Sequence, residues 1–136
     1  MQKFWSSLPQ WLPLPAGTRL PAIIQDAVSG EVLMLVEMNQ EALSLIAATG
    51  RVHYYHPHKR KVVAKGEASG HFQEVLEIRL SCGGDQLLLK VAAAGGACEL
   101  GYQSCFFRRL TPEGWETADP KAFDPEEVYP EIAFSH

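Results

Sequence analysis

The chain has 136 residues, and 46% of them are hydrophobic, as expected for a single soluble globular domain. Its formal net charge of -4 argues against a general affinity for nucleic acid polymers or anionic membranes. No apolar run approaches the roughly 18 to 20 residues that span a bilayer, and prolines interrupt the N-terminal segment where a signal peptide would be apolar. These features predict a cytoplasmic protein that is not embedded in a membrane.

The N-terminal half divides into an arm, a hairpin and a helix. Residues 1–19 contain tryptophans and prolines without periodicity, which predicts an irregular arm. Two apolar runs on either side of Ser29-Gly30 then predict a β-hairpin. Asn39 suits a helix N-cap and Gly50 suits a helix stop, so one short helix is expected between them.

The second half is rich in strand signals, which fall at residues 52–56, 61–64, 72–82 and 86–92, with another around 105–110. Few connections are long enough for helical crossovers, which favours an α+β class with a mainly antiparallel sheet and one or two short helices. Residues 111–136 are acidic and interrupted by prolines, which predicts a peripheral tail. We therefore expect one domain whose body is formed by residues 20–110.

Three cysteines, Cys82, Cys98 and Cys105, are the most informative residues. An odd number of thiols in a chain without a signal-like N-terminus indicates a reducing compartment and metal binding rather than disulfides. Zinc held by three protein ligands keeps a fourth position for water, as catalytic zinc sites do. Three unrelated buried thiols would also fit, because free cysteine packs like a small hydrophobic residue. Spacing alone leaves both interpretations open.

The surroundings of the cysteines favour convergence of two of them. Glycines flank Cys98 and allow a tight backbone, and Cys105 lies one short loop further on. Cys82 ends a strand-like run beside Gly83-Gly84, which suits a two-residue hairpin turn. Cys82 must therefore reach the other two from elsewhere in the fold or from a second subunit.

An ordered set of fragments resembles one known family from about Leu20 to Arg108. The fragments are Ile24-Gln25-Asp26, Gly30-Glu31-Val32-Leu33-Met34-Leu35, Met38-Asn39, Glu41-Ala42-Leu43, Thr49-Gly50, His53-Tyr54-Tyr55, Lys65-Gly66-Glu67, Ser69-Gly70-His71 and the two cysteine segments. Together they resemble phosphoribosyl-AMP cyclohydrolase of histidine biosynthesis. The resemblance implies an intertwined homodimer that opens the purine ring of phosphoribosyl-AMP with water activated by zinc.

The resemblance also implies how the metal is held and where the proton goes. The zinc would be shared between subunits, with Cys82 of one copy facing Cys98 and Cys105 of the other. Three thiolates make zinc a weaker Lewis acid, so a neighbouring base becomes more important. The family places a histidine after the middle cysteine, where this chain has Glu99. That substitution either changes the base or abolishes it, and His71, at a family position, is the second catalytic candidate.

Other family positions differ as well. The family has three aspartates around the first cysteine that are implicated in magnesium binding, whereas this chain has Ser81, Gly83 and Asp85. Asp85 is therefore the one magnesium ligand left, and a plain hairpin turn would explain these residues equally. Pro57 and Val63 replace a family arginine and tryptophan. The residues expected to contact substrate phosphates are Lys59, Lys65, Ser69, Gly70 and Arg108.

Three functional hypotheses follow. The first is a zinc-dependent homodimeric hydrolase that acts on phosphoribosyl-AMP, a small phosphorylated nucleotide. The second is a divergent paralogue that hydrolyses a different cyclic amidine, because the positions of the base, magnesium and arginine have changed. The third is a non-catalytic dimer whose zinc only links the subunits.

Overall fold

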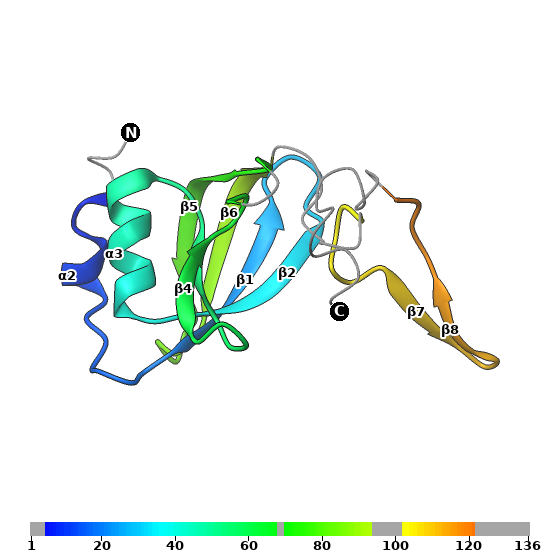
Figure 1. The fold of residues 1–136 in the computed structure, drawn as a ribbon, viewed down its shortest axis with the longest axis horizontal. Helices are drawn as coiled ribbons and strands as arrows, with labels where there is room; N and C mark the ends of the chain where they lie inside the picture. Colours follow the sequence, from blue (N-terminus) through cyan, green and yellow to red (C-terminus); the bar gives the residue numbers. More distant parts are fainter. Residues whose placement is uncertain (1–4, 68–69, 94–101, 122–136) are drawn as a thin grey trace.

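The computed structural model describes residues 5–67, 70–93 and 102–121 (Figure 1). The elements are α2 (Leu8–Trp11), β1 (Leu20–Asp26), β2 (Val32–Met38), α3 (Gln40–Thr49), β3 (His53–His56), β4 (Lys61–Ala64), β5 (Gln73–Leu80), β6 (Leu87–Ala93), β7 (Arg108–Thr111) and β8 (Gly114–Thr117). Six strands form one sheet in the order β4-β3-β2-β1-β6-β5, and β7-β8 form a separate hairpin. All adjacent pairs are antiparallel except β1 and β6, which are parallel. The predicted α+β class with a mainly antiparallel sheet is confirmed.

The predicted first hairpin is confirmed as β1-β2, which pair from Leu20 opposite Met38 to Gln25 opposite Val32. The side chain of Asp26 organises the turn, because its carboxylate accepts the backbone N–H of Val28 at 2.8 Å. Gly30 has a φ of 78°, a left-handed value that a glycine adopts without strain. The local sequence therefore determines where the chain reverses.

Helix α3 begins and ends where the sequence predicts. The Asn39 side chain accepts the backbone N–H of Ala42 at 2.9 Å, and Gly50 ends the helix with a φ of 73°. One face of the helix is buried against the sheet, through Leu43 and Ile46 among others. Helix and sheet thus share one core.

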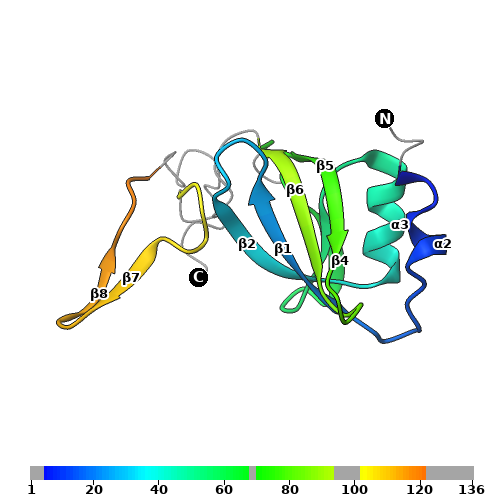
Figure 2. The same cartoon turned by 180° about the vertical axis from the view of Figure 1, so that it is seen from behind.

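That core lies on one face of the sheet, which we call the covered face. Alternate residues of the central strands point into it and are at most 9% exposed: Ala22, Ile24, Met34, Val36, Leu87, Leu89 and Val91. Helices α2 and α3 lie on this side in both views (Figures 1 and 2). The residues between them point the other way, because successive strand residues alternate in direction.

The opposite face, which we call the open face, carries Ile23 of β1, Leu35 of β2 and Leu88 of β6. Ile23 is paired with both Leu35 and Leu88, so the three side chains form one row across neighbouring strands. Ile23 is 41% and Leu35 57% exposed. In the described part of the chain, no helix covers this row. The open face is therefore an apolar surface in contact with solvent.

Two segments differ from the sequence prediction. The arm contains the short helix α2 rather than only irregular chain, with Leu8 and Trp5 packed against the core and Trp11 78% exposed. The strand expected around 105–110 is Arg108–Thr111, and it pairs with β8 in a hairpin that extends away from the sheet (Figure 1). The residues between β7 and β8 suit a turn. The hairpin was not predicted because the acidic composition of residues 111–136 indicated a peripheral tail.

Candidate active site

The two described thiols lie at opposite ends of the sheet. Cys82 is in the loop between β5 and β6, beyond the pair Leu80 and Leu87, whereas the Cys105 N–H donates to the Leu33 carbonyl of β2 at 2.7 Å. With about 3.3 Å per strand residue and about 4.8 Å between strands, the pairing registers separate them by roughly 20 Å. Thiolates that share one zinc ion at about 2.3 Å lie within about 4 Å of each other. One chain therefore cannot bring both thiols to one metal.

A serine hydroxyl holds the loop that carries Cys82. The Ser81 hydroxyl accepts the backbone N–H of Asp85 at 3.3 Å and of Gln86 at 3.1 Å, and donates to the Asp85 carboxylate at 3.2 Å. The Ser81 N–H also donates to the Gln86 carbonyl at 2.9 Å, so the loop between them has four residues. The prediction of a two-residue turn at Gly83-Gly84 was wrong, because Ser81 and Gln86 close the ladder instead.

A serine also holds the segment that carries Cys105. Ser104 is 1% exposed, and its hydroxyl donates to the Val32 carbonyl at 2.6 Å while it accepts the Phe106 N–H at 2.9 Å. Phe107 is buried and stacks on Tyr102 at 3.7 Å between ring centroids. The Cys105 thiol is nevertheless exposed, as is that of Cys82. Both thiols are thus presented on fixed backbone and are accessible to a ligand.

A pocket of about 460 Å³ opens beside Cys105 and is lined by Phe106, Arg108 and Trp115. The Arg108 guanidinium lies 4.6 Å from the centre of the Phe107 ring. Trp115 is 70% exposed. A pocket with a cation beside flat aromatic rings is suited to bind a ligand that has both an aromatic base and a phosphate group. The predicted phosphate contact Arg108 and the predicted metal ligand Cys105 therefore share one pocket.

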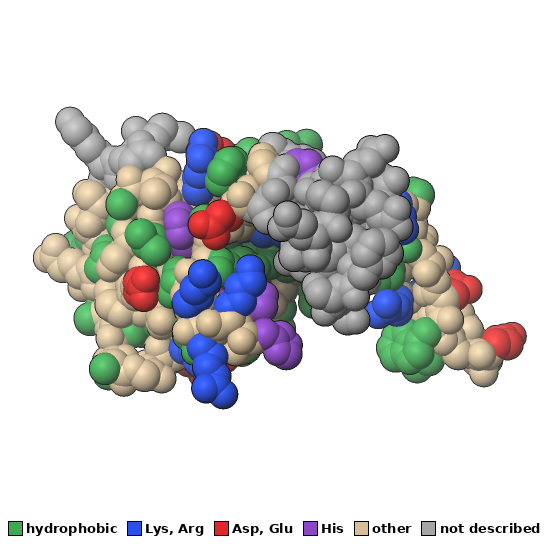
Figure 3. Space-filling view, viewed as in Figure 1, with side chains coloured by type: hydrophobic (Ala, Val, Ile, Leu, Met, Phe, Trp, Pro, Cys, Tyr) green, Lys and Arg blue, Asp and Glu red, His purple; other side chains and the backbone are tan. Residues whose placement is uncertain are grey.

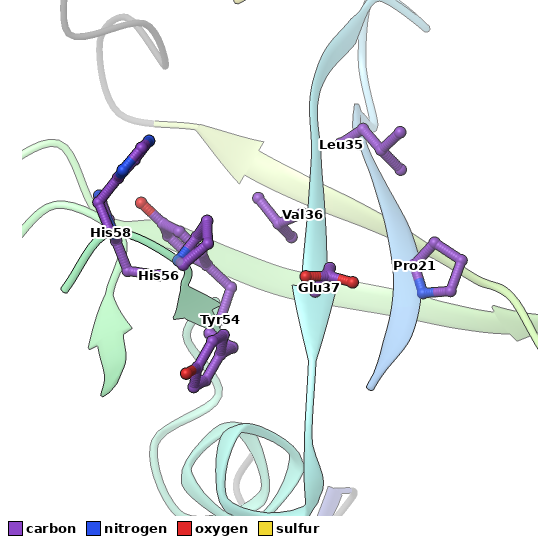
Figure 4. A pocket seen from close by; sticks show the side chains of 9 residues that line it. Pro21, Leu35, Val36, Glu37, Tyr54, His56 and His58 are labelled. Carbon is purple, nitrogen blue, oxygen red and sulfur yellow. The ribbon is translucent and has the colours of Figure 1, made fainter. Parts of the chain in front are cut away.

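A second pocket, of about 440 Å³, lies where β2 and β3 separate (Figure 4). Tyr54, His56 and His58 line one side, and Leu35 and Glu37 of β2 line the other. The strands pair only through Glu37 and Tyr55, within the described residues, which leaves room beyond that pair.

Positive side chains gather over the adjoining turn between β3 and β4 (Figure 3), where Lys59, Arg60 and Lys61 are exposed. The Lys59 N–H donates to His56 Nδ1 at 3.2 Å, which fixes the start of that turn. The predicted phosphate contact Lys59 therefore directly follows His58, which lines the second pocket.

A compact loop brings Lys65, Gly70 and His71 together. Gly66 has a φ of 95°, and a Cβ there would lie 2.6 Å from the His71 backbone, so the position requires glycine. The Gly70 N–H donates to the Gly66 carbonyl at 2.7 Å. Lys65 is only 6% exposed. Its predicted contact with phosphate therefore requires the phosphate group to enter the loop.

Three of the predicted residues, Cys98, Glu99 and Ser69, lie outside the described residues. Among the residues that the structure describes, no group of three or more His, Cys, Asp or Glu side chains converges as metal ligands would. Soft thiolates are nevertheless suitable zinc donors, and the two described ones are exposed. The donor chemistry thus fits zinc if the ligands come from more than one copy.

Sequence reasoning missed two contributors. It gave Ser104 no role, although Ser-Cys occurs at both thiols and could have indicated a common anchoring device. It also did not consider Trp115, which lines the Cys105 pocket. Trp115 lies on β8, after the region that resembles the family, in a hairpin that the sequence did not predict.

Comparison with known proteins identifies the family. Residues 34–107 match the family model for phosphoribosyl-AMP cyclohydrolase. The chain is 50% identical over 112 residues to the phosphoribosyl-AMP cyclohydrolase of Aromatoleum aromaticum, covering 81% of this chain and 84% of that protein. The enzymes of the same name from Bordetella avium and Nitrosospira multiformis are 46% identical over 132 residues and 44% identical over 130 residues, and each is covered to 98% of its length. This chain belongs to the phosphoribosyl-AMP cyclohydrolase family.

The predicted resemblance is therefore confirmed, and with it an assignment to hydrolases that act on C–N bonds in cyclic amidines. The matched segment, residues 34–107, contains Cys82, Cys98, Cys105 and Glu99. Within the described ranges, no helix has the length and apolar character needed to cross a bilayer.

Proposed function

We propose that this chain hydrolyses phosphoribosyl-AMP in histidine biosynthesis, in the cytoplasm. The observation that carries the proposal is the similarity to named phosphoribosyl-AMP cyclohydrolases, which extends over 91% of this chain and 98% of one relative. In the reaction, the oxygen of water bonds to the purine carbon that carries the amino group. The ring bond from that carbon to the alkylated nitrogen breaks, and that nitrogen takes up a proton.

We further propose that zinc is bound between two copies, by Cys82 of one and by Cys98 and Cys105 of the other. The separation of roughly 20 Å between Cys82 and Cys105 supports sharing, because three hydrogen-bonded strands lie between the two thiols. When bound, zinc would lower the pKa of a water molecule and so supply the nucleophile. The anchoring by Ser81 and Ser104 would hold the thiols in position before the metal arrives.

The other residues would bind substrate and move protons. Glu99 would accept a proton from water, as a carboxylate can when it is held beside the reacting group. Arg108 and Lys59 line or adjoin the two pockets, where they would contact phosphates. His71 would lie near the pocket, and Asp85 would be a magnesium ligand with one oxygen already engaged by Ser81.

The paralogue hypothesis has one specific observation in its favour. The Ser81 hydroxyl occupies the place of a family aspartate and binds Asp85, so fewer carboxylate oxygens are available to magnesium. A direct assay distinguishes the paralogue hypothesis from the hydrolysis of phosphoribosyl-AMP. Purified protein is incubated with phosphoribosyl-AMP, zinc and magnesium, and ring opening is followed by absorbance; absence of turnover would exclude the first hypothesis.

A mixing experiment tests the shared site. Cys82→Ser and Cys105→Ser variants should each be inactive, whereas an equal mixture, after subunit exchange, should regain roughly a quarter of wild-type activity. Half of the dimers are then mixed, and each mixed dimer has one intact site out of two. If each chain held its own zinc, mixing would restore nothing, and zinc content would remain at the level of the separate variants.

Glu99→Gln tests the base. It should lower kcat by about 10²- to 10⁴-fold and leave zinc content unchanged, because the amide cannot accept a proton but occupies the same space. A variant with full kcat would remove Glu99 from the proposed mechanism.

A further inference from the structure

The β7-β8 hairpin carries exposed apolar side chains that are not part of the core. Trp115 is 70% exposed, and its cross-strand partner Leu110 is 65% exposed. Phe106, just before the hairpin, is 59% exposed. Figure 3 shows hydrophobic and positive side chains next to each other over this part of the molecule. Exposed apolar side chains that gather at one place mark ligand-binding or contact surfaces.

Hydrogen bonds at both ends of the hairpin fix the backbone that carries Trp115. Strands β7 and β8 are paired along their whole length. At the turn, the Thr111 hydroxyl donates to the Gly114 carbonyl at 2.8 Å. At the base, the Ala118 N–H donates to the Phe107 carbonyl at 2.7 Å. The indole is therefore presented from a defined position and not from a loose loop.

The two consecutive arginines of β7 point to opposite sides of the hairpin. Arg109 forms an ion pair with Glu116 on one side. Arg108 is on the side of Trp115, because Trp115 pairs with the residue two positions after Arg108. Within the described part of the chain, no carboxylate forms an ion pair with Arg108. Positive charge is therefore available to an anionic ligand on the Trp115 side alone.

Both residues border the pocket of about 460 Å³ that also contains Cys105. This volume lies in the range of small-molecule sites, about 300 to 1,000 Å³. Cys105 and Arg108 are three residues apart, so their Cα atoms are separated by at most about 11 Å. A ligand with a flat ring and a phosphate can thus contact the indole, the guanidinium and the surroundings of the thiol together.

We propose that Trp115 stacks on the purine ring of phosphoribosyl-AMP and sets the plane in which that ring lies beside Cys105. This role rests on the proposed function, which brings the reacting carbon to the Cys105 pocket. Water adds to a purine carbon from above or below the ring plane. An indole on one side of the ring leaves the opposite side for water, while Arg108 contacts a phosphate. Trp115 is therefore a specificity-determining residue that requires a flat base.

Tryptophan fluorescence tests the stacking without turnover. In a variant with Trp5→Phe and Trp11→Phe, Trp115 is the remaining tryptophan, and AMP should quench its emission in a saturable way. Ribose 5-phosphate, which has no base, should leave the emission unchanged. The control variant carries Trp5→Phe and Trp115→Phe and keeps the 78% exposed Trp11 of α2, which AMP should not quench. Unchanged Trp115 emission, or equal quenching of the two variants, would overturn the proposal.

Steady-state kinetics of the full enzyme give a second readout. Trp115→Ala should raise KM for phosphoribosyl-AMP by about 5- to 100-fold, as expected for the loss of one base stack. The kcat should change much less, because the stack is present both in the bound substrate and in the transition state. Trp115→Phe retains a ring and should raise KM by less than about 5-fold. Trp11→Ala makes the same chemical change at an exposed indole of α2 and should leave KM unchanged.

The outcomes separate the stacking from the proposed reaction. Saturable quenching by AMP in a chain that opens no purine ring would support the stacking and refute the reaction. Normal ring opening with an unchanged KM in Trp115→Ala would support the reaction and refute the stacking. Sedimentation of Trp115→Ala addresses a contact between copies: altered sedimentation with an unchanged KM would show that the indole serves assembly, and would overturn the proposal.

Discussion

The two faces of the sheet are built from the same strands and yet have different environments. On β1, Ile24 is completely buried under the helices, whereas its neighbour Ile23 is 41% exposed. Both are isoleucines with the same intrinsic strand preference, so local propensity does not distinguish them. What separates them is the direction of the side chain, which alternates along a strand. One set of residues therefore stabilises the fold of a single chain, and the other set remains exposed to solvent.

The largest expected effect on stability comes from substitutions at the two neighbouring isoleucines of β1. Ile24→Ala should lower the free energy of unfolding by about 2–5 kcal/mol, because it leaves a cavity in a packed core. Ile23→Ala should cost less than about 1 kcal/mol in dilute protein, since a half-exposed side chain buries less surface. Urea denaturation of both variants measures the difference. Equal losses would mean that the open face is part of the single-chain core.

A second variant tests the anchor of Cys105 beside β2. Ser104→Ala removes the partners of the Val32 carbonyl and the Phe106 N–H, so stability should fall by about 1–3 kcal/mol. Zinc content should fall with it. Ser29→Ala is the matched control, because that hydroxyl accepts one N–H, from Glu31 at 3.1 Å, in an exposed turn. Equal losses at both serines would argue against a special role for Ser104.

A third variant weakens the helix that covers the sheet. Asn39→Ala should cost about 1 kcal/mol, because the Ala42 N–H loses its capping partner. Asn39→Asp should retain most of the stability, as aspartate caps equally well. Thermal denaturation compares the two. A loss with aspartate as large as with alanine would show that something other than capping is involved.

The smallest effect is expected outside both faces, on the β7-β8 hairpin. Arg109 and Glu116 form an ion pair there with side chains 65% and 45% exposed. Glu116→Gln should change stability by less than about 1 kcal/mol, since water already solvates both charges. Chemical denaturation at low and high salt checks this. A loss well above that range would indicate that the ion pair is shielded from water in solution.

The sequence predicted the parts of the fold that local chemistry determines. Asn39 and Gly50 mark the two ends of α3, because a capping side chain and a left-handed glycine act on adjacent backbone. The first hairpin follows from its turn residues. The parallel pairing of β1 with β6 could not be predicted, because it joins residues more than 60 positions apart through backbone hydrogen bonds that carry no sequence signal. The four-residue loop at Cys82 was missed because Ser81 closes it with its side chain.

The site was predictable as a set of residues but not as an arrangement. The cysteine pattern and the family resemblance indicated Cys82 and Cys105 before any fold was known. Their positions at opposite ends of one sheet depend on strand order, which three isolated thiols do not encode. Trp115 joins the Cys105 pocket only because β8 folds back on β7.

The parallel contact between β1 and β6 has a consequence for synthesis on the ribosome. β1 leaves the ribosome before β6, Leu87–Ala93, which is the strand that completes its second edge. Until that segment emerges, the nascent chain presents a free backbone edge flanked by apolar residues, which is a template for association with other chains. The interval is set by translation speed rather than by local folding rates. Chaperone binding during this interval would protect the unfinished sheet.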